Sequence, residues 1–199
     1  MDHSYLYSTR IEKTFDEDNA EIISTFKQEL LINPRLNVRL INYYKGLPVS
    51  YPARVVSVEK DIIDLDVIPH QIFTMEEPRY TFIRSKALKR DVYAKVQYAN
   101  IKRSAISLRK FCYVEIMAER RDYLRLEMDT HPNALLITSE GVVRGQLTEL
   151  AINGACIKIE QPCDLEIDAE ITLCFMLHSI HQNLDYNVKS KAKLVGIEG

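Results

Sequence analysis

One long stretch near the start of the chain has apolar residues at the spacing of an α-helix. They recur every three or four positions, at Phe15, Ile22, Ile23, Phe26, Leu30 and Leu31. Thr14 followed by Glu17 is a capping-box pattern, in which two side chains satisfy backbone amides at a helix N-terminus. Asn33 and Pro34 end the pattern, because proline cannot continue a helix. The sequence therefore predicts one α-helix over about residues 14–32, packed on the domain that follows.

From Leu36 the apolar period changes from helical to two, which is typical of strands with one buried face. The predicted strands cover 36–40, 53–58, 62–67, 79–83, 92–98 and 111–117. Turn-forming residues such as Lys45-Gly46 separate them, and short strands at this spacing predict a small antiparallel barrel. Residues 1–13 could add an edge strand or dock on a partner, and 69–75 could form one helical turn or a loop.

The same alternation returns in the last third of the chain. Predicted strands cover 134–137, 142–147, 155–159, 169–177 and 192–197, with 177–183 as a hairpin connection. A barrel that stops there would leave backbone groups unpaired along one edge. We therefore expect a second barrel that is incomplete at the C-terminus.

The predicted fold class is mainly β: two small antiparallel β-barrels joined by a short linker, with one N-terminal α-helix. The expected divisions are an N-terminal extension and helix (1–34), a first barrel (35–117), a linker (118–126) and a second barrel (127–199).

Composition narrows the class of protein. Hydrophobic residues make up 46% and charged residues 27% of 199 residues, as in ordinary globular domains. A net charge of −2 excludes a generally basic surface, so we expect no DNA or RNA binding. The four cysteines, Cys112, Cys156, Cys163 and Cys174, form no CxxC pair, and we interpret them as reduced and structural. Without a signal peptide pattern or an apolar run of membrane-spanning length, we expect no membrane insertion and a cytoplasmic location.

Arg120, Arg121 and Arg125 are the main candidate for chemistry. Guanidinium groups bind phosphate bidentately and stack on aromatic planes, so three of them in six residues could hold a flat or anionic ligand. The alternative is a solvated linker whose charge is balanced by Glu119 and Asp122. Because these arginines lie between the two barrels, a ligand that neutralised them could change the orientation of the barrels.

Catalytic and metal-binding patterns are absent from the sequence. His178 and His181 have a spacing that would suit a metal only on a helix, and a solvated loop is the better interpretation. There is no nucleophile elbow, zinc-protease motif or glycine-rich phosphate loop. We therefore expect a protein that is not an enzyme and that has no metal or cofactor.

A second polar stretch, Glu149 to Ala155, follows the arginines by about two strands and contains the turn-forming pair Asn153-Gly154. With it, the chain from about Leu36 to Gly199 resembles PilZ-domain proteins, bacterial receptors for cyclic di-GMP, in the two-domain form typified by flagellar-brake proteins. The first signature of that family is RxxxR, commonly preceded by another arginine. The second is an acidic residue or Asn, then Ser two positions later and Gly three after that. The matching positions are Arg120, Arg121 and Arg125 for the first signature and Glu149, Ala151 and Gly154 for the second.

The resemblance implies a PilZ-like first barrel, a PilZ second barrel and a cyclic di-GMP site at the linker. It implies that the arginines contact phosphates and guanine edges, and that the second motif contacts the guanines. It also implies regulation of motility or biofilm formation through a protein partner, such as a flagellar motor or a secretion or synthesis component. The open edge expected at the C-terminus leaves room for a homodimer built by strand pairing. Ala151 lacks the family's hydroxyl, and Glu149 is one methylene longer than Asp. An adaptor that keeps the scaffold without binding the nucleotide is therefore the alternative function.

Overall fold

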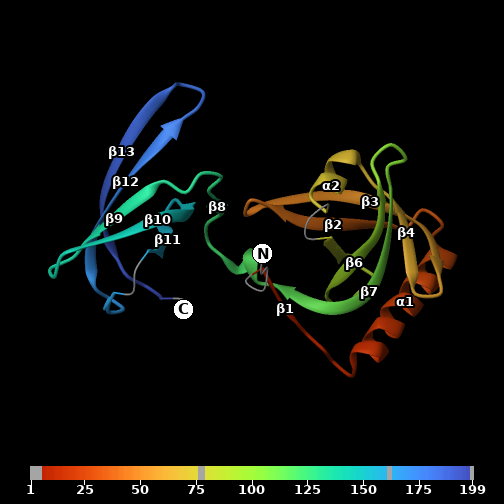
Figure 1. Ribbon diagram of the computed structural model, residues 1–199. Coiled ribbons are helices and arrows are strands. Elements are labelled where there is room, and N and C mark those ends of the chain that lie inside the picture. Colours follow the sequence, from red (N-terminus) through yellow and green to blue (C-terminus); the bar gives the residue numbers. More distant parts are fainter. Residues whose placement is uncertain (1–5, 76–78, 161–162, 198–199) are drawn as a thin grey trace. The chain divides into compact units, whose positions relative to one another are not determined.

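The computed structural model describes residues 6–75, 79–160 and 163–197. The chain divides into two compact units, Met1–Asp122 (unit 1) and Tyr123–Gly199 (unit 2), which Figure 1 shows in sequence colours. The fold is mainly β, as predicted, with 53% of the described residues in strands and one main helix among them.

Unit 1 is a closed six-stranded antiparallel barrel. Its strands are β2 (Asn37–Tyr44), β3 (Leu47–Glu59), β4 (Ile62–Asp66), β5 (Tyr80–Arg84), β6 (Asp91–Asn100) and β7 (Ala105–Ile116). The order is β7-β4-β3-β2-β5-β6, and pairing of β6 with β7 closes the ring. Alternation sends one side of each strand into a core that contains Leu40, Val55, Leu65 and Leu108.

Helix α1 (Phe15–Ile32) packs along this barrel beside β7 and β3 (Figure 1). The predicted cap is present, because the Thr14 hydroxyl accepts a hydrogen bond from the Glu17 amide. Ile22, Ile23 and Phe26 are buried, whereas Leu31 is 84% exposed. The apolar pattern therefore located the helix correctly but overestimated how far its buried face extends. The segment at 69–75 forms a short helix, α2 (Pro69–Phe73), one of the two predicted alternatives.

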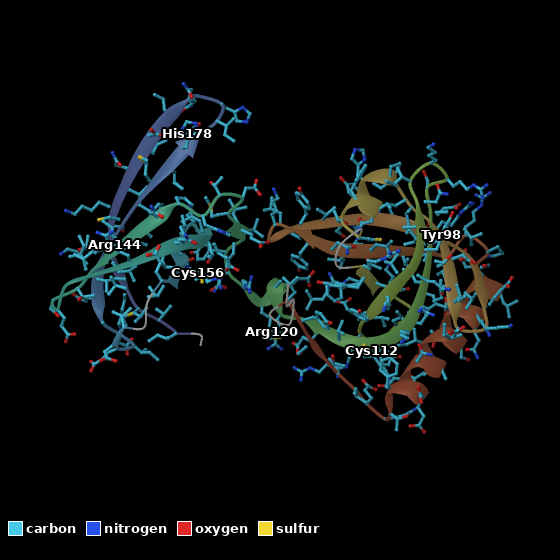
Figure 2. All side chains as sticks on the ribbon, in the orientation of Figure 1. Tyr98, Cys112, Arg120, Arg144, Cys156 and His178 are labelled. Atoms are coloured by element: carbon cyan, nitrogen blue, oxygen red, sulfur yellow. The ribbon has the colours of Figure 1, made fainter. Side chains whose placement is uncertain are left out.

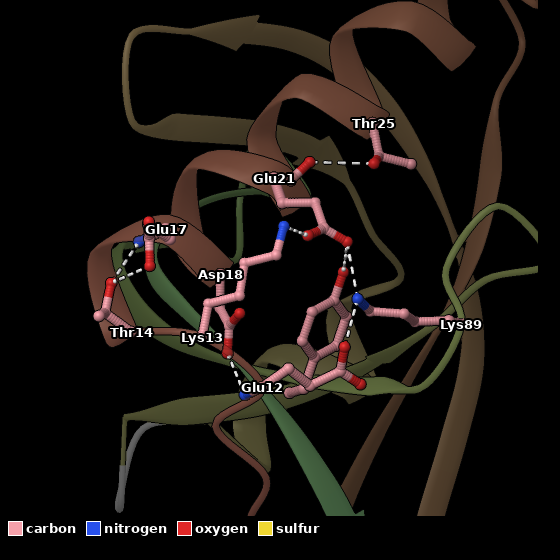
Figure 3. Close-up of polar contacts among 9 residues, drawn as sticks. Glu12, Lys13, Thr14, Glu17, Asp18, Glu21, Thr25 and Lys89 are labelled. Carbon is pink, nitrogen blue, oxygen red and sulfur yellow. Dashed lines mark hydrogen bonds and ion pairs between the residues drawn. The ribbon is translucent and has the colours of Figure 1, made fainter.

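A polar cluster fastens the N-terminal segment and α1 to the barrel (Figure 3). The Lys89 ammonium lies 2.5 Å from a Glu12 carboxylate oxygen and 2.8 Å from one of Glu21. The Tyr113 hydroxyl donates to Glu21, and buried Asp18 accepts from the Glu12 amide. Hydrogen bonds from Lys89 and then from Lys13 stabilise the Glu21 carboxylate and, with that from Tyr113, lower its pKa to about 2.

Strand β1 (Tyr7–Thr9) pairs antiparallel with the end of β7, so residues 1–13 do supply an edge strand. Tyr7 covers a second apolar cluster outside the barrel. The centroid of its ring lies 5.2 Å from that of Phe82 and 5.5 Å from that of Tyr93. The N-terminal segment is thereby held against the residues that directly precede the arginines.

Unit 2 is a half-barrel. Its strands are β8 (Arg125–Glu127), β9 (Asn133–Ile137), β10 (Val142–Ala151), β11 (Gly154–Ile159), β12 (Glu170–Ser179) and β13 (Leu184–Lys193). The order is β11-β10-β9-β12-β13, with β8 added to β10. The inner face contains Ala134, Leu136, Leu147, Leu173 and Phe175. Among the described residues, the sheet does not close into a ring.

Several details of the strand prediction were wrong. The last strand is 184–193 rather than 192–197, because β13 is polar on its exposed face and its alternation is weak. Strand β7 begins at Ala105, before the predicted 111. The interpretation of the cysteines as structural holds for Cys112, which is buried, but Cys156 and Cys163 are exposed; all four are free thiols.

Candidate functional site

Hydrogen bonding of β8, β10 and β11 brings Arg125 of the first motif to the second motif within unit 2. Ala151 on β10 pairs with Arg125 on β8 and with Gly154 on β11. Glu149 pairs in the same way with Glu127 and Cys156. Residues two apart on a strand point to the same side. Arg125, Glu149, Ala151 and Gly154 therefore share one face of these three strands.

Arg125 and Glu149 form an ion pair on this face. Their closest nitrogen and oxygen lie 3.7 Å apart, and their side chains are 51% and 25% exposed. Solvent screening limits such a pair to about 0–1 kcal/mol. A guanidinium has five N–H donors, so one ion pair leaves Arg125 able to bind an anion as well. The arrangement can hold an anionic ligand without a large cost in lost contacts.

Gly154 has no role that the fold explains. A Cβ atom at this position would meet no atom within 4 Å, and the backbone is not in the left-handed region. Gly145, by contrast, is required for packing, since a Cβ there would lie 2.6 Å from the Lys158 carbonyl oxygen. The bare backbone at Gly154 leaves room on the same face as Arg125.

The other two arginines belong to unit 1. Arg120 ends the 3-10 helix η1 (Met117–Arg120) and forms an ion pair with Glu115 on β7; Figure 2 labels Arg120. The other oxygen of the same carboxylate lies 2.5 Å from Arg10, which follows β1. Glu115 therefore accepts from an arginine on each side. Pairing of Ser8 with Glu115 in the β1–β7 ladder positions this contact.

A second ion-pair network fixes η1. Glu119 lies 2.7 Å from Arg84, which also donates two hydrogen bonds to Asp91. The contact with Asp91, and then that with Glu119, raise the pKa of Arg84. Burial first, and then the charge of Glu119, raise the pKa of Tyr43 to about 12, while the charges of Arg84 and Arg121 oppose the increase. Half-buried Arg121 thus lies in the electrostatic environment of Tyr43.

Sequence reasoning missed three residues of this region: Glu115, Glu127 and Cys156. Glu115 is five residues before Arg120, and neither a helix nor a strand brings two residues at this spacing into regular contact. Glu127 and Cys156 join Glu149 only through strand register. The alternation of charged and apolar residues in Arg125-Leu126-Glu127 is the one local signal that could have indicated β8.

His178 lies in β12, and its Nδ1 is 2.8 Å from a carboxylate oxygen of Asp185 on β13. The two side chains are half exposed. Within 6–75, 79–160 and 163–197, no three His, Cys, Asp or Glu side chains are grouped so that they could hold a metal ion. No helix in these ranges is both long and apolar enough to cross a membrane.

Comparisons with known proteins give structural neighbours only. No protein-family model and no curated protein matches the chain. One similar solved structure is the inhibitor of motility MotI/DgrA of Bacillus subtilis, with 12% identity, 82% of this chain and 80% of that chain covered, and a TM-score of 0.35. A second is YcgR of Escherichia coli in complex with c-di-GMP, with 12% identity, coverage of 100% and 81%, and a TM-score of 0.33. A third is MrkH of K. pneumonia in its apo state, with 13% identity, coverage of 96% and 78%, and a TM-score of 0.35.

Similarity at these identities and TM-scores assigns neither a ligand nor a site to the present chain. The three structures named above are PilZ-domain proteins, the family whose two motifs the present sequence resembles.

Proposed function

We propose that the chain is a cytoplasmic receptor of the PilZ type that binds cyclic di-GMP at its linker and passes the signal to a protein partner. The arginine motif and the second motif are the basis of this proposal. The observation that carries it is the strand register that puts Arg125 on one face with Glu149, Ala151 and Gly154. Residues up to 29 positions apart in the chain, from Arg125 to Gly154, then form one candidate surface.

The short spacing between the arginines along the chain supports a contribution from all three of them. Three residues separate Arg121 from Arg125, so an extended chain keeps their Cα atoms within about 14 Å. A ligand with two phosphates and two guanine bases offers several acceptors to guanidinium groups, since arginine pairs well with phosphate and with the O6 and N7 edge of guanine. In this proposal, the linker arginines close on the ligand and the barrels change orientation.

The departures from the family pattern in the second motif reduce the contacts available to the ligand. Ala151 provides no hydroxyl, and the loss of one hydrogen bond costs about 0.5–1.5 kcal/mol, up to about tenfold in affinity. Glu149 keeps the carboxylate, which Arg125 holds on the same face. The proposal therefore expects weaker but specific binding. The adaptor without nucleotide binding is the outcome if these losses are decisive.

Isothermal titration calorimetry of the whole chain with cyclic di-GMP tests the proposal, with GMP as the control nucleotide. Binding should be detectable for cyclic di-GMP and at least tenfold weaker for Arg121→Ala, because a charge-assisted bidentate contact is lost. Arg103→Ala is the matched control, since this exposed arginine lies at the β6–β7 turn. Absence of heat with cyclic di-GMP, or an equal effect of both variants, would reject receptor function and leave the adaptor.

A further inference from the structure

The outward face of the unit 2 half-barrel has an apolar centre with basic residues along its borders. Strand pairing gives two cross-strand rows on the side opposite the core. The first row is Arg144, Leu135, Cys174 and Lys189, on β10, β9, β12 and β13. The second is Val142, Ile137, Thr172 and Lys191 on the same strands. Each row thus has its middle residues uncharged and a lysine at the β13 border.

The apolar centre of this face is exposed in unit 2. Leu135 and Ile137 are each 39% exposed, Met176 is 50% and Val142 is 58%. The inner neighbours on the same strands are buried, since Ala134 and Leu136 are at most 3% exposed. The outer side chains therefore do not belong to the core. A contiguous exposed apolar patch bordered by polar residues marks an interaction surface more often than scattered apolar residues do.

The borders carry four cations that form no ion pair among the described residues. Lys189 and Lys191 on β13, Arg144 on β10 and Lys158 on β11 are all exposed, and none of them forms an ion pair with another described residue. Lys158 pairs with Gln146, which places it on the same face as Arg144. Figure 2 labels Arg144 on this sheet. Three spacings separate β10 from β13, so the two basic borders lie about 14 Å apart.

We propose that this face binds an amphipathic α-helix of a partner protein whose apolar stripe is bracketed by carboxylates. A helix with its side chains is about 10–12 Å wide, which fits the apolar centre and brings both flanks close to the basic borders. The apolar stripe of the helix would cover Leu135, Ile137 and Val142. Its carboxylates would pair with the lysines of β13 and β11 and with Arg144. Charge complementarity of this kind guides association and selects the partner.

Other occupants fit this surface less well. A second copy would bring the same cations opposite one another, and lysines on an edge strand such as β13 oppose strand pairing between copies. An anionic bilayer is a poorer occupant, because the face offers no aromatic anchor among its described residues. Nucleic acid would leave the apolar centre uncovered.

The test uses the whole chain without nucleotide, so its outcome is independent of cyclic di-GMP binding. The probe is a fluorescently labelled helical peptide of about five turns with a leucine stripe bracketed by glutamates. The control peptide has lysine in place of each glutamate. Fluorescence anisotropy should show binding of the acidic peptide that weakens with added salt, and at least tenfold weaker binding of the lysine peptide.

Variants locate the interaction. The double variant Arg144→Glu/Lys189→Glu should weaken acidic-peptide binding at least tenfold, whereas Lys86→Glu/Lys102→Glu, a matched change in unit 1, should leave it unchanged. Val142→Ser, which changes an exposed side chain without altering charge, should weaken binding severalfold. Thermal unfolding checks that each variant is folded. The proposal would be overturned by equal binding of the two peptides, by no binding of the acidic peptide, or by equal effects of both double variants. Binding to phosphatidylserine vesicles in place of the peptide would also overturn it.

Discussion

Glu115 and Arg120 form an ion pair that holds the first arginine of the motif against the strand before it. Arg10 contacts the other oxygen of the same carboxylate. An anionic ligand that recruits Arg120 must compete with Glu115, and Arg10 can still neutralise that carboxylate after Arg120 leaves. The N-terminal strand β1 is thereby connected to the proposed ligand site through one glutamate.

Glu115→Gln should increase the affinity for cyclic di-GMP, because the neutral amide competes less strongly for Arg120. Exposed ion pairs of this kind are worth about 0–1 kcal/mol, so the expected gain is up to about fivefold. Calorimetry measures it, with Glu59→Gln in the same unit as the matched control. A decrease in affinity for Glu115→Gln, or an equal gain for the control, would contradict competition for Arg120.

Gly154→Val should leave the stability nearly unchanged and weaken ligand binding, because the added side chain meets no protein atom within 4 Å at its Cβ but occupies the face that carries Arg125. Thermal unfolding and calorimetry on the same sample separate the two effects. Gly145→Ala is the opposite case. Its Cβ would lie 2.6 Å from a backbone oxygen, so about 1–3 kcal/mol of stability should be lost. Unchanged affinity in Gly154→Val would exclude that face as the ligand site.

Glu149→Asp with Ala151→Ser restores the second motif of the PilZ family. Each regained hydrogen bond contributes about 0.5–1.5 kcal/mol, so the affinity for cyclic di-GMP should rise by about one order of magnitude or more. Glu140→Asp with Ala169→Ser is the control, because it makes the same two changes in unit 2 away from β8, β10 and β11. If the natural chain shows no binding and the restored variant does, the natural protein is the adaptor.

Stability should depend on pH through Glu21. Its pKa is about 2 in the folded chain, against an ordinary value of 4.5, because Lys89 stabilises the carboxylate. The carboxylate therefore contributes stability fully above about pH 4.5, and this contribution disappears as pH falls towards 2. Urea unfolding of Glu21→Gln should show a lower midpoint than the natural chain at neutral pH and a similar midpoint near pH 2. An equal difference at both pH values would mean that ionisation of Glu21 is not responsible.

Local patterns carried much of the prediction. The capping residue Thr14, the helical apolar spacing and Asn33-Pro34 defined α1 to within a residue, because these signals act through the backbone of the helix itself. Period-two alternation indicated the two β units, because successive side chains of a strand point to opposite faces. It failed at β13, where Asp185, Asn187 and three lysines occupy the exposed face and hide the alternation of Tyr186 and Val188.

The sequence by itself determined which residue types are available: the arginines, the second motif with its missing hydroxyl, and the order of helix and strands. Tertiary structure decided which of them meet. Strand register joined Arg125 to Glu149, Ala151 and Gly154, which follow it by 24 to 29 positions. Pairing of β1 with β7 brought Arg10 to the carboxylate that also holds Arg120. Such contacts depend on hydrogen-bond pairing between distant segments, and a shift of one residue would turn each side chain to the opposite face.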